Sequence, residues 1–269
     1  MSESSPTDPY LERFGGIGRL YGKDTLEKFR SAHVAIVGIG GVGSWVAEAL
    51  ARSGIGTITL VDLDDICLTN TNRQIHAIEG TVGKPKIQVM AERLKAINPE
   101  VTVVEEAMFF NESTAEAFFA KSFDAIVDAI DSVRQKSLLL AMARERKIAT
   151  VTVGGAGGRV DPGRIKVADM SQTYGDRLLM LTRKKLRQQY RFPRTGKGKF
   201  KIPCVYSSEP PRFPWSDGSI CDTREPDSPG GLNCEAGLGS ATHITASMGL
   251  FAAGLTLELL ERFGVLKHV

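Results

Sequence analysis

Short apolar runs alternate with amphipathic stretches between residues 34 and 153 of the chain. The apolar runs are rich in valine and isoleucine, which is typical of buried strands, and they lie at 34–37, 57–61, 101–104, 125–129 and 150–153. Helices are predicted between them at 44–53, 84–97, 111–120 and from residue 132 onward. This alternation predicts an α/β fold, a doubly wound and mostly parallel sheet with helices on both faces.

Local signals set some of the expected boundaries. Asp24 is a good N-cap for a helix that continues to Phe29. Ser132, followed three residues later by Gln135, predicts a capping box at the start of a helix. Residues 1–12 are rich in Ser, Pro and acidic residues, so they are expected to form a flexible tail. They contain no basic region followed by an apolar stretch, which argues against a signal peptide and favours a cytoplasmic protein.

Beyond residue 153 the pattern is less regular. The glycines at 154–158 are expected to form a flexible loop that leaves the sheet, followed by a strand at 164–168, a helix at 176–190 and an irregular loop or lid at 207–233. Residues 236–257 contain no Asp, Glu, Lys or Arg and are long enough to span a membrane. Their many Ser, Thr, Gly and Ala residues favour a helix packed on the sheet, and membrane association is the weaker alternative.

The sequence VAIVGIGGVG at 34–43 places a cluster of glycines between the first strand and the first helix of the alternation. Glycine allows positive φ and close approach of the backbone to a phosphate. The start of a helix adds unpaired N–H groups and the positive end of the helix dipole. We therefore expect the phosphates of a nucleotide at these glycines, which are Gly38, Gly40, Gly41 and Gly43.

Charged residues after the predicted strand ends narrow the class of nucleotide. Asp62 follows the second strand, where an acidic side chain meets the hydroxyls of a ribose, but a nicotinamide dehydrogenase would share that feature. A triphosphate needs several cations and a carboxylate for Mg²⁺. Arg73, Lys84, Lys86 and Asp131 supply them. Because ligands bind outside the carboxyl ends of parallel strands, these side chains should converge, which favours MgATP or a similar nucleotide.

The motifs GIGGVG, VDLDDI, TNTNRQ, GKPK and AIDS resemble those of the adenylating enzymes of the ThiF/MoeB/HesA superfamily, over residues 13–169. The resemblance implies a Rossmann-like core that binds ATP with Mg²⁺. It also implies attack of a substrate carboxylate on the α-phosphate, giving an acyl adenylate and pyrophosphate. Carried over by motif, Asp131 would hold Mg²⁺, Asp62 the ribose, and the remaining nucleotide contacts would come from Gly41, Asp64, Asn70, Arg73 and Lys86.

The resemblance also implies a homodimer. Arg13, in the sequence RFGG, resembles an N-terminal arginine that members of the superfamily reach across a two-fold axis to the active site of a second copy. Arg19 is the alternative for this role, because the spacing of the two arginines departs from the usual pattern.

Later motifs (NTNRQIHA, DAIDSVR, GGAGG, SDG and NCEAGLGSAT) are similar to those of the branch of the superfamily that modifies tRNA. That branch adenylates the threonyl carboxylate of a threonylcarbamoyl-adenosine next to the anticodon, and the carbamoyl group then closes a ring and expels AMP. Residues 170–269 would form a basic segment, an irregular loop and a C-terminal helix packed on the core as one unit. A cysteine desulfurase or a sulfur acceptor is a further candidate partner, since relatives act in sulfur transfer.

Positive charge is concentrated in residues 183–201, although the net charge of the chain is only +3. Tyr190, Phe192 and Phe200 lie within this segment, so it resembles a surface that tracks phosphates and stacks bases. A solvated surface loop is the alternative. The tRNA-binding residues expected here are Arg183, Lys184, Lys185, Arg187, Arg191, Arg194, Lys197, Lys199 and Lys201.

The cysteines Cys67, Cys204, Cys221 and Cys234 form no C-x-x-C pair, which argues against a structural zinc site. Cys234 is interpreted as a small buried residue, with a covalent, sulfur-handling role as the alternative. Two other functions stay open. An activating enzyme for the C-terminus of a sulfur-carrier or ubiquitin-like protein is disfavoured by the missing zinc pairs. A nucleotide-sensing module without turnover is disfavoured by the combination of Arg73, Lys86 and Asp131.

Overall fold

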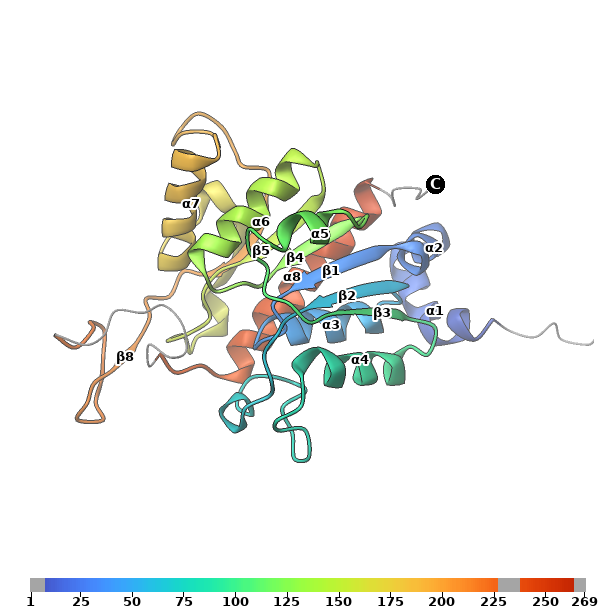
Figure 1. Cartoon of the computed structure of the whole chain (residues 1–269), viewed down its shortest axis with the longest axis horizontal. Coiled ribbons are helices and arrows are strands. Elements are labelled where there is room, and N and C mark those ends of the chain that lie inside the picture. The colour runs from blue at the N-terminus through green and yellow to red at the C-terminus, as the bar shows by residue number, and fades with distance from the viewer. Residues whose placement is uncertain (1–7, 227–237, 264–269) are drawn as a thin grey trace, which may run out of the picture.

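A seven-stranded sheet with the order β3-β2-β1-β4-β5-β7-β6 forms the centre of the protein within residues 8–226 and 238–263, which are the residues described by our computed structural model (Figure 1). All neighbouring strands are parallel except β6, which pairs antiparallel with β7 at one edge. The strands are β1 His33–Val37, β2 Thr57–Val61, β3 Thr102–Glu106, β4 Ala125–Asp128, β5 Ala149–Val153, β6 Ile165–Asp169 and β7 Pro203–Ser207. A small hairpin, β8 Phe213–Pro214 with β9 Ile220–Cys221, lies outside this sheet.

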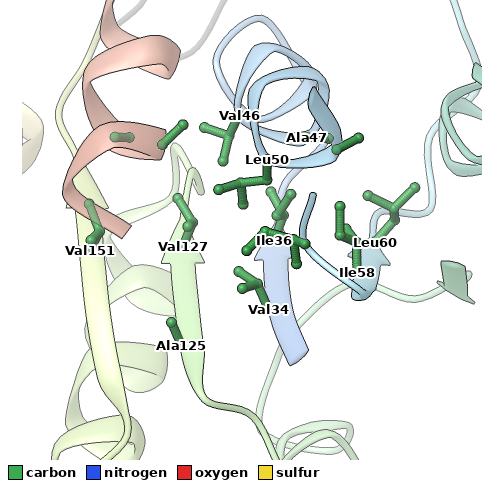
Figure 2. Packing of buried hydrophobic residues seen from close by; sticks show 14 of the residues in the cluster. Val34, Ile36, Val46, Ala47, Leu50, Ile58, Leu60, Ala125, Val127 and Val151 are labelled. Atoms are coloured by element: carbon green, nitrogen blue, oxygen red, sulfur yellow. The ribbon is translucent and has the colours of Figure 1, made fainter. Parts of the chain in front are cut away.

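Helices cover both faces of the sheet (Figure 1). The helices of the described residues are α1 Pro9–Tyr21, α2 Lys23–Ser31, α3 Gly43–Arg52, α4 Lys86–Ile97, α5 Ala115–Phe119, α6 Val133–Glu145, α7 Arg177–Gln189 and α8 Thr242–Phe263. Helices α3, α4 and α8 pack on one face, where Val34 and Ile36 of β1 meet Val46 and Leu50 of α3 (Figure 2). On the other face, Ala35 and Val37 of β1 meet apolar residues of α5 and α6. The doubly wound α/β fold predicted from the alternation is therefore confirmed.

The predicted start of one helix and the predicted cap of another are wrong. The helix predicted at 111–120 spans only Ala115–Phe119, because the side chain of Asn111 accepts hydrogen bonds from the N–H groups of Ser113 and Thr114 and closes a turn first. Ser132 is the N-cap of α6, as predicted, but its hydroxyl donates to the side chain of Gln135 and makes no capping bond to the backbone. The capping box itself is therefore not formed.

The expected tail of residues 1–12 is a helix from Pro9 onward, and residues 1–7 lie outside the described residues. Asp8 caps this helix α1 by accepting the N–H of Tyr10 at 2.9 Å. Tyr10 is buried, and its hydroxyl donates to the carbonyl of Gly54 at 2.6 Å. The prediction failed because Tyr10 is anchored by residues far away in the sequence, which composition does not reveal.

The glycines at 154–158 do not form the free exit loop that was expected. A Cβ on Gly154 would lie 2.3 Å from the carboxylate of Asp176, the N-cap of α7, and the N–H of Gly155 donates to that carboxylate at 2.8 Å. Gly158 has a φ of +72°, and its N–H donates to the carbonyl of Gly239 at 2.7 Å. The loop thus joins the start of α7 to the segment that leads into α8.

Helix α8 confirms the prediction that the apolar C-terminal segment packs on the sheet. It contacts α3 closely, since a Cβ on Gly249 would lie 2.8 Å from Cβ of Trp45. By length and composition α8 could cross a membrane, but half of its apolar stretch is buried in the protein, and core helices of globular proteins have the same length and composition. Cys234 and part of the expected loop at 207–233 lie outside the described residues.

Candidate active site at the carboxyl edge of the sheet

The order of the sheet reverses at β1, because β2 lies on one side of it and β4 on the other. Such a switch point creates a crevice outside the carboxyl ends of the two strands, where doubly wound folds bind their ligands. The glycine turn follows β1 there, and the turn that carries Asp131 follows β4. The two turns touch, because a Cβ on Gly38 would lie 2.9 Å from the carbonyl oxygen of Ala129.

The four glycines of the first turn have different tasks. Gly38 has a φ of +94°, and a Cβ on Gly43 would lie 1.8 Å from the carbonyl oxygen of Gly38, so both residues are required by the turn itself. A Cβ on Gly40 would meet nothing within 4 Å. Its open side leaves room for a phosphate to approach the backbone at the start of α3.

Arg73 lies over this glycine turn. A Cβ on Gly41 would be 3.2 Å from Cγ of Arg73 and 3.3 Å from Cγ2 of Thr245. The carbonyl oxygen of Arg73 accepts hydrogen bonds from Nε1 of Trp45 at 3.1 Å and from Oγ1 of Thr245 at 3.3 Å. Nη1 of Arg73 donates to the carbonyl of Thr69 at 2.8 Å. Residues of α3 and α8 therefore fix the backbone of the arginine beside the expected phosphates.

Asp62, Asp64 and Lys86 form a second group at the end of β2. Asp62 accepts the backbone N–H of Ile39 at 2.7 Å and that of Asp64 at 2.9 Å. The buried Nζ of Lys86 lies 2.7 Å from Oδ2 of Asp64 and 4.0 Å from Oδ1 of Asp62. Burial raises the pKa of Asp62, while the charge of Lys86 opposes that rise. Lys84 is exposed and has no ion pair within the described part of the chain.

Asn70 is buried and shapes the turn that carries Arg73. Its Oδ1 accepts the N–H of Cys67 at 3.1 Å, and its carbonyl accepts the N–H groups of Arg73 and Gln74, both at 3.0 Å. The observed hydrogen bonds of Asn70 therefore hold the turn together. The contact with phosphate that the sequence predicts stays a prediction.

Asp131 presents an exposed carboxylate in the turn between β4 and α6. Over residues 8–226 and 238–263, no group of three or more His, Cys, Asp or Glu side chains could hold a metal ion. Mg²⁺ does not need such a cage, because it commonly binds through one or two carboxylates, substrate phosphates and water. A single exposed carboxylate, two residues after the Ala129 that touches the glycine turn, fits that chemistry.

Arg13 lies away from these residues. Its Nη1 donates to the carbonyl of Ile97 at the end of α4, at 3.3 Å, and it lines an open hollow of about 360 Å³ together with Phe14, Arg52 and Ala96. Arg52 ends α3, a helix of 10 residues that begins at the glycine turn, so the hollow is ~15 Å from that turn. Within one chain Arg13 does not join the site. Arg19 is also exposed on α1.

The basic segment from Arg183 to Lys201 is partly built into the core. Phe192 and Phe200 are buried against each other with ring centres 4.8 Å apart, so the prediction that they stack on bases is wrong. Arg183 is half-buried and donates to the hydroxyl of Thr173, and burial lowers its pKa. Arg187 lies over the ring of Phe200 at 5.2 Å. The exposed cations are Lys184, Arg191, Arg194, Lys197, Lys199 and Lys201.

Two buried polar features near the site were missed in the sequence. His76 is buried, and neither of its ring nitrogens has a hydrogen-bond partner. Burial, reinforced by the charges of Lys86 and Arg93, lowers the pKa of His76 to about 4, so the ring is neutral. Lys136 of α6 is fully buried against Asp128. Its signal in the sequence is a cation on the apolar face of a helix, at the i, i+3 and i+4 spacing with Leu139 and Leu140.

Comparison with known proteins identifies the family of the chain. Residues 16–265 match the ThiF family, and the chain belongs to that family. The tRNA threonylcarbamoyladenosine dehydratase of Haemophilus influenzae is 48% identical over 254 residues, which cover 94% of this chain and 95% of the relative. Solved structures of the E. coli tRNA N6-threonylcarbamoyladenosine dehydratase, in complex with ATP and with AMP, are 41% identical with TM-scores of 0.83 and 0.82. Each covers 97% of this chain, and the matches span 98% and 99% of those chains. The family resemblance drawn from the motifs is thereby confirmed.

Proposed function

We propose that the protein is an ATP-dependent enzyme that dehydrates N6-threonylcarbamoyladenosine in tRNA. The observation that carries the proposal is the convergence of Arg73 on the glycine turn, beside Lys86 and Asp62, in a chain that is 48% identical to a dehydratase of this name. The solved relatives that contain ATP and AMP support the same nucleotide chemistry.

The reaction balances through an adenylate. An oxygen of the threonyl carboxylate attacks the α-phosphorus of ATP, and pyrophosphate leaves. The carbamoyl group of the same nucleoside then attacks the activated carbonyl, and AMP leaves with the former carboxylate oxygen. The water removed from the nucleoside is thus accounted for by the hydrolysis of ATP to AMP and pyrophosphate. No nucleophilic side chain is needed, since the second attack is intramolecular and has a high effective concentration.

The side chains of the proposed site bind the nucleotide and neutralise the negative charge of its phosphates. In the proposal the open backbone at Gly40 and the N-terminus of α3 receive phosphate oxygens, and Arg73 and Lys86 compensate the negative charge that shifts to the leaving pyrophosphate. Asp62 receives the ribose hydroxyls. Mg²⁺, when bound at Asp131, supplies further neutralisation of the phosphates. The Lys86–Asp64 pair keeps the lysine head at this edge until the nucleotide binds.

The exposed cations of the basic segment are proposed to bind the tRNA backbone. Arg144, whose guanidinium lies 4.2 Å from the centre of the Phe192 ring, is near the end of α6, a helix of 13 residues that begins at the turn of Asp131. The segment is therefore ~18 Å from that turn along the helix. These cations would hold the tRNA at a distance from the reacting nucleoside, and they should affect tRNA affinity more than the chemical step.

We further propose a cytoplasmic homodimer in which Arg13 of a second copy completes the site. The support is the position of Arg13, which is exposed and ~15 Å from the glycine turn of its own chain. Sedimentation of the purified protein, together with mixing of Arg13→Ala and Asp131→Ala chains, tests this. Mixed dimers should regain about a quarter to a half of wild-type activity if the arginine acts across the dimer, and none if it acts within its own chain.

One labelling experiment tests the reaction itself. tRNA carrying a threonylcarbamoyl group with ¹⁸O in its carboxylate is incubated with the protein and MgATP. We expect ¹⁸O in AMP, pyrophosphate as the second product and a nucleoside lighter by one water. Label in inorganic phosphate together with ADP would show acyl phosphate formation instead. Absence of turnover with tRNA, but AMP formation with a small protein that ends in Gly-Gly, would favour the alternative of a carrier-protein activating enzyme.

A further inference from the structure

Three polar side chains, all fully buried, lie behind the turn that carries Asp131. Nζ of Lys136 donates to Oδ2 of Asp128 at 2.8 Å, and Oγ1 of Thr152 donates to the same oxygen at 2.7 Å. The three side chains come from α6, the end of β4 and β5. None of them is a proposed nucleotide contact, so the role of this buried group is open.

Asp128 connects the group to the turn. Its second carboxylate oxygen, Oδ1, accepts the backbone N–H of Ile130 at 3.1 Å. The N–H of Ala129 donates to the carbonyl of Val37 at 2.9 Å, and Ala129 in turn limits the space at Gly38. The two residues before Asp131 are therefore held on one side by the glycine turn and on the other by the buried carboxylate.

Stability alone does not explain a charge pair in this place. Moving both charges out of water costs about as much as their attraction returns, and apolar residues of similar volume are often as stable or more so. The surrounding face of α6 is apolar, with Leu139 and Leu140 fully buried. An apolar triplet would fit these surroundings, but it could not accept the N–H of Ile130.

We propose that Lys136 is a positioning residue. Together with Thr152 it holds the Asp128 carboxylate in the one orientation that binds the N–H of Ile130, and so it sets the position of Asp131 relative to the glycine turn. The role of Asp131 as a metal-binding group rests on the proposed function, whereas the role of Lys136 in ordering the turn does not.

A volume-conserving triple variant, Asp128→Leu with Lys136→Met and Thr152→Val, separates positioning from stability. Because it leaves no unpaired buried charge, its urea midpoint should stay near that of the wild type. Exchange of the Ile130 amide with solvent deuterium should become about tenfold faster, as expected for the loss of one hydrogen bond to a charged group. The Mg²⁺ concentration for half-maximal AMP formation should rise by about the same factor, and the KM for ATP should change less than about twofold.

Tyr10→Phe is the matched control, because it removes a buried hydrogen bond of α1 that is remote from the turn. It should lower the urea midpoint without changing Ile130 exchange or the Mg²⁺ requirement. If the triple variant does not fold, the single variant Thr152→Val tests the proposal. Its Ile130 exchange rate and its Mg²⁺ requirement should change in the same directions, each by about threefold. A folded variant with wild-type exchange at Ile130 would overturn the proposal. If the wild type formed no AMP at all, the proposed function would fail, and the exchange measurement would still test whether Asp128, Lys136 and Thr152 together hold the turn.

Discussion

The backbone N–H of Ile39, inside the glycine turn, donates a 2.7 Å hydrogen bond to the carboxylate of Asp62 at the end of β2. One carboxylate thus has two tasks in the proposed site, because it orders the turn that would receive the phosphates and it faces the position expected for the ribose. Only the second task was expected from the sequence.

Asp62→Ala should weaken ATP binding about tenfold to a hundredfold, because a charged hydrogen-bond acceptor is lost at the turn and at the ribose. Comparison of ATP with 2′,3′-dideoxy-ATP by calorimetry separates the two tasks. The wild type should prefer ATP, and Asp62→Ala should bind both nucleotides with similar affinity. If the variant kept the full preference for ATP, Asp62 would act on the turn alone.

Lys86→Met should lower kcat/KM for ATP by about two orders of magnitude, because it removes a main electrostatic contact to the phosphates. Lys84→Met is the informative comparison, since Lys84 is exposed and only two residues away. We expect it to behave like the wild type in an assay of AMP formation. Equal losses in the two variants would mean that general charge, and not the position of Lys86 next to Asp62 and Asp64, is what matters.

Asp131→Ala should lower turnover by roughly two or more orders of magnitude, as expected for the loss of the carboxylate proposed to bind the metal. ATP binding measured without Mg²⁺ should remain. Asp65→Ala serves as a control, because Asp65 is an exposed carboxylate in the connection after β2. Near-normal turnover of Asp131→Ala at low Mg²⁺ would remove Asp131 from the site.

The sheet could be predicted because each strand is a local apolar run, and the positions of Asp62, Arg73 and Lys86 followed from the strand ends. What failed depends on contacts between distant residues. Tyr10 is buried by Leu26 and Gly54, and Phe192, which follows the end of α7, is covered by Arg144 of α6. Neither partner lies in the neighbouring sequence. Such partners can be known only once the chain is folded.

The pairing of Lys136 with Asp128 could not be predicted from the sequence for a related reason. A lysine in a helix is usually a surface residue, and only the register of α6 shows that this one points into the core. Asp128 and Asp131 lie in the same short motif, DAIDS, and nothing local in the sequence shows which of the two is buried. The positions of chemical groups were thus easier to predict than the side chains that hold them.

Neutralising exposed lysines of the basic segment should weaken tRNA binding and flatten its salt dependence. For the triple variant Lys184→Gln, Lys197→Gln and Lys199→Gln, the magnitude of the slope of log K against log salt should fall by about 2 to 3, if each lysine releases counterions from one phosphate. The KM for ATP should not change. A control triple variant of exposed lysines elsewhere, at Lys23, Lys95 and Lys147, should keep the wild-type slope. An unchanged slope in the first variant would exclude this segment as the tRNA surface.

His76 should make the protein less stable in mild acid. Its pKa is about 4 in the folded protein and 6.5 when unperturbed, so between these values the unfolded chain binds a proton that the folded protein does not. The free energy of unfolding should therefore be undiminished above pH 6.5 and fall as the pH drops toward 4. At pH 5 the loss due to His76 should be about 2 kcal/mol.

The variant His76→Phe removes this contribution and keeps an aromatic ring at the position. Urea denaturation at pH 7.5 and pH 5 should show a smaller decrease for His76→Phe than for the wild type, by that amount, while His243→Phe, which changes an exposed histidine, should keep the wild-type decrease. Equal decreases for His76→Phe and the wild type would show that the pKa of His76 is not lowered in the folded protein.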